Sequence, residues 1–158
     1  MKNLIVRTVS GIVFLLVMLT ALLLGNIVDC GKYFFALGML FALIVMMHEF
    51  YRMRMDQIYK IPRAVAITGS CWMFLVTFFV QSYEQAHGRF IILAFIPVFI
   101  LMINALLVKD KSEFGKFADI YTGILYIAVP WTLLNFTVFS HNKFDGLPLL
   151  CLFILIWC

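Results

Sequence analysis

The residues of this chain that could do chemistry are few, and the richest group is residues 48–54, with the sequence HEFYRMR. It follows residues 33–47, an apolar run without a charged side chain, and brings an acid, two arginines and two aromatic rings within seven residues. This composition is typical of an apolar helix leaving a membrane, with rings at headgroup level and basic groups reaching water. The stretch is therefore a candidate site at a membrane surface, with Glu49 and Arg52 as its candidate residues.

A second polar group of interest is Asn104, which lies about one turn before Lys109 at the end of another apolar run. If the second, fourth and fifth apolar helices pack together, one recess at the membrane surface could be lined by His48, Glu49, Asn104, Asp119, Tyr121 and Thr122. The alternative is structural, with Glu49 pairing with a nearby arginine and Asn104 bonding a neighbouring helix. Glu49, Arg52 and Asn104 are therefore candidate substrate-binding or supporting residues.

The composition explains why so few polar groups are available. The chain has 158 residues, of which 65% are hydrophobic and 13% charged, and its mean hydropathy is +1.05. A soluble domain has about half apolar and a quarter charged residues, and a β-barrel has short alternating segments in place of long apolar runs. The net charge of +4 comes without a Lys/Arg-rich block carrying interleaved aromatics, so we expect no nucleic-acid partner.

The apolar runs predict an all-α fold, a polytopic transmembrane helical bundle of five full spans and a truncated sixth. Most of these runs have close to the ~20 residues that cross a bilayer. The predicted spans are residues 9–28, 33–50, 64–80, 90–108, 120–139 and 147–158. The first is predicted to be a retained helix, because no small-residue cleavage site follows it as in a signal peptide. The sixth is only ~18 Å long as a helix, so we expect residues 1–158 to be the N-terminal transmembrane portion of a longer membrane protein.

Prolines and small residues inside the spans predict how the helices bend and pack. Pro97 and Pro130 each remove a backbone hydrogen bond, which predicts kinks near Ile96 and Val129. Small side chains permit close approach of a neighbouring helix. Two such groups are Gly38 with Ala42, and Ala66 with Gly69 and Ser70.

The basic residues predict that the N-terminus is cytosolic. With that orientation, nine basic residues fall on the cytosolic side and three on the other, which is a positive-inside distribution. The nine are Lys2, Arg7, Arg52, Arg54, Lys60, Arg63, Lys109, Lys111 and Lys116. The three are Lys32, Arg89 and Lys143.

Several kinds of functional site are missing from the sequence. There is no phosphate-binding glycine loop, dinucleotide motif, nucleophile elbow or histidine pair. No Asp, Glu, Lys or Arg lies in the middle of a predicted span, which argues against an ion-coupled transporter or voltage sensor. The four cysteines have no metal-ligand spacing and are interpreted as buried apolar thiols; they are Cys30, Cys71, Cys151 and Cys158. We expect no metal site in this chain.

Three short motifs resemble a known family. RTVSGI at residues 7–12, EFYR at residues 49–52 and FILIWC at residues 153–158 look like the N-terminal half of bacterial phosphatidate cytidylyltransferase, also called CDP-diacylglycerol synthase. The resemblance implies an enzyme that joins phosphatidate to CTP with Mg²⁺, releasing pyrophosphate, in the bacterial cytoplasmic membrane. It also leaves a homodimer possible. The lipid would come from the leaflet and CTP from the cytosol.

The resemblance transfers no catalytic residue to this chain. The stretches of the family that carry metal and nucleotide are expected beyond Cys158, and the matching positions Arg7, Thr8, Glu49 and Arg52 come without a role. We therefore expect the 158-residue chain alone to be inactive. The alternatives are a small non-enzymatic membrane subunit or scaffold and, third, a transporter.

Overall fold

The computed structural model describes residues 16, 19–23, 31–54, 60–83, 88–107, 111–140 and 143–157. This part of the chain is helical apart from one small hairpin. The elements are α2 (Gly31–Arg54), α3 (Lys60–Ser82), the 3₁₀-helix η2 (Gly88–Phe95), α4 (Ile96–Leu107), α5 (Lys111–Gly123), the π-helix η3 (Ile124–Ala128), α6 (Val129–Val138), β1 (Phe139–Ser140), β2 (Lys143–Phe144) and α7 (Leu147–Trp157). The all-α prediction is confirmed.

Four helices of the described chain are long and apolar enough to cross a membrane. They comprise Gly31–Met53, Arg63–Ser82, Gly88–Leu107 and Phe117–Val138, and they match the predicted spans 33–50, 64–80, 90–108 and 120–139. The predicted span 9–28 lies largely outside the described residues, and α7 is an 11-residue helix. The total number of spans and the cytosolic N-terminus stay predictions.

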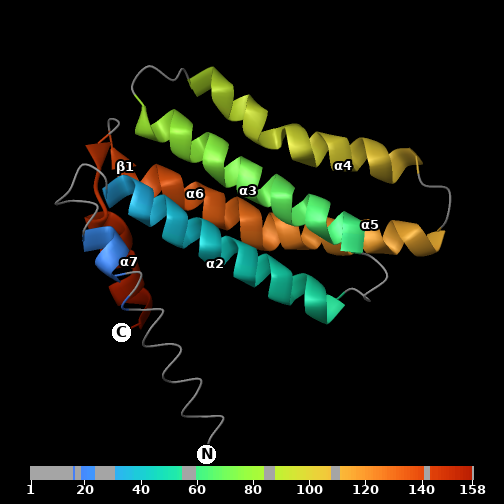
Figure 1. Ribbon diagram of the computed structural model, residues 1–158, viewed down its shortest axis with the longest axis horizontal. Coiled ribbons are helices and arrows are strands. Elements are labelled where there is room, and N and C mark those ends of the chain that lie inside the picture. The colour runs from blue at the N-terminus through green and yellow to red at the C-terminus, as the bar shows by residue number, and fades with distance from the viewer. Residues whose placement is uncertain are drawn as a thin grey trace, which may run out of the picture.

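The long helices run antiparallel in chain order, with α3 at the centre. Figure 1 shows α4 on one side of α3 and α2 with α6 on the other, and α3 contacts all three. The segments α5, η3 and α6 follow one another as a single rod, and α7 packs against α6. The end of α2, the start of α3, the end of α4 and the start of α5 therefore lie at one end of the bundle (Figure 1). We call it the Arg63 end.

The core of the bundle follows a strip of α2. Met39, Leu43, Met47 and Tyr51 are four residues apart and each is fully buried, which places them along one side of the helix. The outer helix α4 differs, since large side chains such as Leu106 remain about three-quarters exposed, at 76%. A water-soluble surface rarely carries apolar exposure on that scale, whereas a lipid-facing surface does.

The small residues of α3 that were predicted to face a neighbouring helix are buried, and Gly69 lies against α4. Ala66 and Ser70 are fully buried, and a Cβ atom built on Gly69 would lie 2.9 Å from the Cβ of Pro97. The close contact predicted at Gly38 is not found, because a Cβ there would meet no described atom within 4 Å. The predicted pattern is therefore found on α3, whereas of the pair on α2 Ala42 is buried and Gly38 shows no close contact with a described residue.

The helix type changes beside both prolines. The 3₁₀-helix η2 becomes α4 at Ile96, directly before Pro97. The π-helix η3 ends at Ala128, and the Val129 N–H donates to the Ile124 carbonyl, one residue further back than in an α-helix. Proline lacks the N–H that a regular α-helix needs, so these changes of hydrogen-bond register occur where the sequence predicts kinks.

A short antiparallel hairpin joins α6 to the segment before α7. Phe139 pairs with Phe144, and Ser140 with Lys143. The carboxylate of Asp145 then accepts a hydrogen bond from the Leu147 N–H at 3.0 Å and so caps the start of α7. This hairpin is the one pair of strands among the described residues.

Candidate functional site

The polar residues at the end of α2 form an exposed cluster. The Arg52 Nη1 and Glu49 Oε1 atoms lie 3.5 Å apart, with 69% and 54% of the two side chains exposed. Such an exposed pair contributes only about 0.2–1 kcal/mol, so either side chain can exchange this partner for another at small cost. The structural alternative for Glu49, pairing with a nearby arginine, is confirmed.

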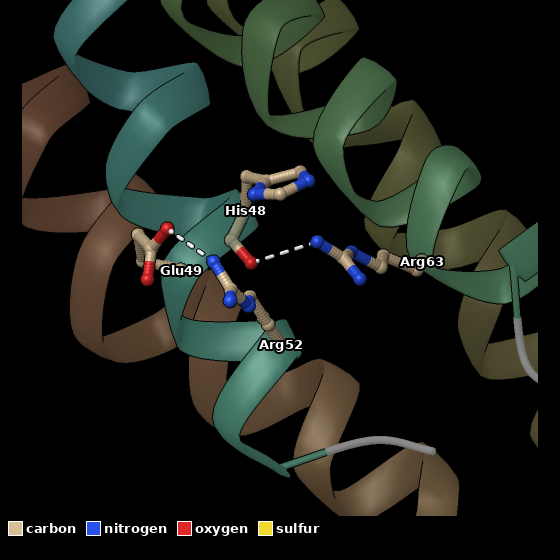
Figure 2. Close-up of polar contacts among 4 residues, drawn as sticks. All are labelled: His48, Glu49, Arg52 and Arg63. Carbon is tan, nitrogen blue, oxygen red and sulfur yellow. Dashed lines mark hydrogen bonds and ion pairs between the residues drawn. The ribbon is translucent and has the colours of Figure 1, made fainter. Parts of the chain in front are cut away.

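The same helix end is joined to α3 by Arg63. Figure 2 shows the Arg63 guanidinium reaching from α3 to the carbonyl of His48 on α2, and its Nη2 donates there at 2.9 Å. The arginine side chain is half-buried between the two helices. This bond fixes one guanidinium group beside the Glu49–Arg52 pair, and sequence reasoning counted Arg63 only as a basic residue.

Tyr51 is the main correction to the predicted site. We expected the rings of Phe50 and Tyr51 at headgroup level, but Tyr51 is fully buried and Phe50 packs against the core. The Tyr51 hydroxyl donates to the Ile120 carbonyl of α5 at 2.9 Å. A Cβ on Gly123 would lie 2.5 Å from the same hydroxyl oxygen, so a glycine is needed for this ring to fit. The ring therefore joins α2 to α5 and does not anchor the helix at the membrane surface.

Asn104 lies at the Arg63 end but apart from the cluster. It is exposed on α4, and its Nδ2 donates to the Ile100 carbonyl of its own helix at 2.9 Å, not to a neighbouring helix as the alternative expected. The recess hypothesis required the second, fourth and fifth helices to pack together. The structure brings α2 and α5 into contact, but α4 lies on the other side of α3 (Figure 1). Asn104 is therefore not part of the α2–α5 junction.

The residues of α5 that the recess hypothesis named are placed beside that junction. The Thr122 hydroxyl donates to the Ala118 carbonyl at 2.8 Å and is exposed. Asp119 is half-buried. The Tyr121 hydroxyl is buried and has no hydrogen-bond partner among the described residues. Neither hydroxyl bonds to Glu49 or His48 in the described part of the chain.

A buried polar contact that sequence reasoning missed joins α3 to α6. The Asn135 Nδ2 donates to the Thr77 hydroxyl at 2.9 Å and to the Phe74 carbonyl at 3.3 Å, and Asn135 is fully buried. A single amide in an apolar span was the available signal. Interhelical bonds of this kind hold membrane helices together, and this one lies toward the end of the bundle opposite Arg63.

The described residues offer no ready metal site. No three of the His, Cys, Asp and Glu side chains in this part of the chain form a group that could hold an ion. The described carboxylates Glu49, Asp119 and Asp145 belong to α2, α5 and the turn before α7. These three carboxylates do not fit the Mg²⁺ that the resemblance implies.

Of the described cysteines, Cys71 is half-buried and Cys151 is exposed, and both are free thiols. The prediction of burial is wrong for Cys151, and Cys30 and Cys158 lie outside the described residues.

With this geometry established, comparison with known proteins gives one decisive result. A model of the cytidylyltransferase family matches residues 5–158. The chain belongs to this family. It is the family of phosphatidate cytidylyltransferase, so the resemblance of the three short motifs is confirmed. No curated protein and no solved structure matches the chain. Family membership makes the chain part of a group of CTP-using nucleotidyltransferases, and its four apolar helices are those of a membrane protein.

Proposed function

We propose that the chain serves a cytidylyltransferase that makes CDP-diacylglycerol from CTP and phosphatidate during phospholipid synthesis. The observation that carries the proposal is the family match over residues 5–158. The helical bundle supports it, because a lipid substrate has to be met within a membrane. The bacterial cytoplasmic membrane is the proposed location, and a homodimer stays a prediction.

The reaction has a simple balance. A phosphate oxygen of phosphatidate attacks the α-phosphorus of CTP, a new P–O bond forms, and the bond to the β-phosphate breaks. Pyrophosphate leaves with its electron pair, and cytidylate stays on the lipid. Catalysis of such a step depends on positioning and on neutralising the crowded phosphates.

The described part of the chain contributes basic groups that can neutralise phosphate charge. They lie at the Arg63 end, where α2 ends and α3 begins. It does not supply a carboxylate cluster for divalent ions, although the family chemistry is proposed to use Mg²⁺. Because the resemblance transfers no catalytic residue to the 158-residue chain, we propose that the purified chain does not form CDP-diacylglycerol by itself. Radiolabelled CTP and phosphatidate with added Mg²⁺ test this, and metal-dependent labelled lipid formed by the purified chain would refute it.

The proposed function is tested by comparing lipid acceptors. Membranes containing the product of the natural gene are incubated with labelled CTP and either phosphatidate or diacylglycerol of the same acyl chains. The expected result is labelled lipid with phosphatidate only, because diacylglycerol lacks the attacking phosphate. Labelling of a different acceptor, with none from phosphatidate, would contradict the proposed substrate.

A further inference from the structure

We propose that Arg63 and Arg52 together bind the phosphate of a phospholipid headgroup where α2 and α3 reach the membrane surface. The inference deepens the proposed function, because the phosphate of phosphatidate would be the ligand. It is measured by binding without CTP, so it can fail while the transferase activity stands, and the reverse.

The depth of both arginines is that of a lipid phosphate. The candidate span of α2 ends at Met53, one residue after Arg52, and that of α3 begins at Arg63. The end of α2 and the start of α3, which carry these residues, lie at the Arg63 end of the bundle (Figure 1). Basic side chains at the ends of membrane spans sit at headgroup level and attract anionic lipids.

Arg63 is held in place for this task. Its Nη2 bond to the His48 carbonyl fixes the guanidinium between the helices, and the described residues give its other donors no partner. A guanidinium has five N–H donors in a rigid fork that fits phosphate oxygens. The Arg63 guanidinium is therefore pre-oriented, and most of its N–H donors remain available to bind a phosphate.

Arg52 can supply the second guanidinium. It lies one turn after His48, and helical side chains point back toward the preceding turn. Figure 2 shows it beside Glu49 and the His48 carbonyl that Arg63 reaches. Its contact with Glu49 is long and exposed, so the guanidinium can turn to a phosphate at little cost.

Two groups of α2 oppose an incoming anion. The Glu49 carboxylate carries a negative charge next to Arg52, and the carbonyl end of a helix bears the negative end of its dipole. Arg63 donates to the His48 carbonyl, which lies six residues before the end of α2. The Glu49 carboxylate therefore competes with the phosphate for Arg52. We expect removal of the carboxylate charge to strengthen phosphate binding.

The test measures lipid binding to the 158-residue chain in neutral phosphatidylcholine nanodiscs, by native mass spectrometry. Phosphatidate is compared with diacylglycerol of the same acyl chains, and with inorganic phosphate and CTP in solution. The expected result is phosphatidate binding that diacylglycerol and the soluble phosphates do not share. Arg52→Gln and Arg63→Gln each weaken it about tenfold, since each removes a hydrogen bond to a charged group.

Further variants separate binding from folding. Glu49→Gln strengthens phosphatidate binding severalfold, and Arg63→Lys keeps the charge but loses the fork and binds between wild type and Arg63→Gln. Arg89→Gln is the matched control, because it removes one exposed arginine from the start of η2, a helix end opposite the Arg63 end (Figure 1), and leaves binding unchanged. If Arg63→Gln does not fold, Arg52→Gln decides, since Arg52 forms no bond between described helices.

Three results would overturn the proposal. The first is wild-type phosphatidate affinity in Arg52→Gln. The second is equal binding of diacylglycerol, which would mean that the acyl chains alone are recognised. The third is binding of inorganic phosphate or CTP with the same dependence on both arginines, which would assign the pair to a soluble phosphate.

Discussion

Gly123→Ala is the substitution whose effect follows most directly from the structure. The new Cβ would lie 2.5 Å from the Tyr51 Oη, 2.8 Å from Cζ and 2.9 Å from Cε1. Tyr51 is fully buried and its hydroxyl is bonded to Ile120, so the ring has no open space to move into. Either the ring shifts and loses this bond, or α2 and α5 separate.

The loss in the free energy of unfolding can be estimated from these contacts. Overpacking of a buried site costs about 1–3 kcal/mol, and a displaced hydrogen bond costs about 0.5–1.5 kcal/mol. Alanine is the better helix former by about 1 kcal/mol, which offsets part of that sum. We expect Gly123→Ala to lower the free energy of unfolding by about 1–3 kcal/mol, measured by SDS titration in mixed micelles.

A matched control and a double mutant separate this cause from others. Gly38→Ala changes a glycine of α2 whose Cβ would meet no described atom within 4 Å, so it leaves stability unchanged or raises it by up to about 1 kcal/mol. Tyr51→Phe removes the nearest atom, so its combination with Gly123→Ala costs less than the sum of the two single changes. The reasoning is refuted if Gly123→Ala is as stable as wild type, or if Gly38→Ala is equally destabilising.

The spans could be predicted from the sequence because bilayer thickness imposes its length on each apolar run. A close helix contact on α3 was also predicted, because Ala66, Gly69 and Ser70 are small residues on one helix, but the sequence did not indicate that α4 would be the neighbour. The role of Tyr51 was not predictable from composition. A ring beside arginines at a span end resembles a headgroup anchor, and its true partner, Ile120, lies 69 residues away.

Only part of the candidate site could be predicted from the sequence, because only part of it depends on neighbouring residues of one helix. The Glu49–Arg52 pair is local, three residues apart on one helix, so the sequence indicates it. The Arg63 bond to His48 depends on how α2 and α3 pack, and the distance of Asn104 from the cluster depends on the position of α4. Tertiary placement of this kind leaves no local pattern to detect.

Three further predictions concern single contacts. Gly69→Ala places a Cβ 2.9 Å from the Pro97 Cβ, so it lowers the free energy of unfolding by about 1–2 kcal/mol and with it the thermal midpoint in detergent; an unchanged midpoint would show that α3 and α4 can separate at this contact without cost. Thr77→Val removes the shorter bond of the buried Asn135 amide and costs about 1 kcal/mol in the same SDS titration, and adding Asn135→Leu recovers part of it unless the amide is bonded elsewhere. Glu49→Gln changes stability by less than about 0.5 kcal/mol because its ion pair is exposed, and a loss above about 1 kcal/mol would mean that the carboxylate holds the fold.

The most direct test of the account follows which phosphate of CTP reaches the lipid. Membranes containing the product of the natural gene are given phosphatidate and CTP labelled at either the α- or the γ-phosphate, and the extracted lipid is counted. A cytidylyltransferase moves the α-label into lipid and releases the γ-label as pyrophosphate, which is the result we predict. Label from the γ-phosphate in lipid, with none from the α-phosphate, would show phosphate transfer in place of cytidylyl transfer and contradict the central claim.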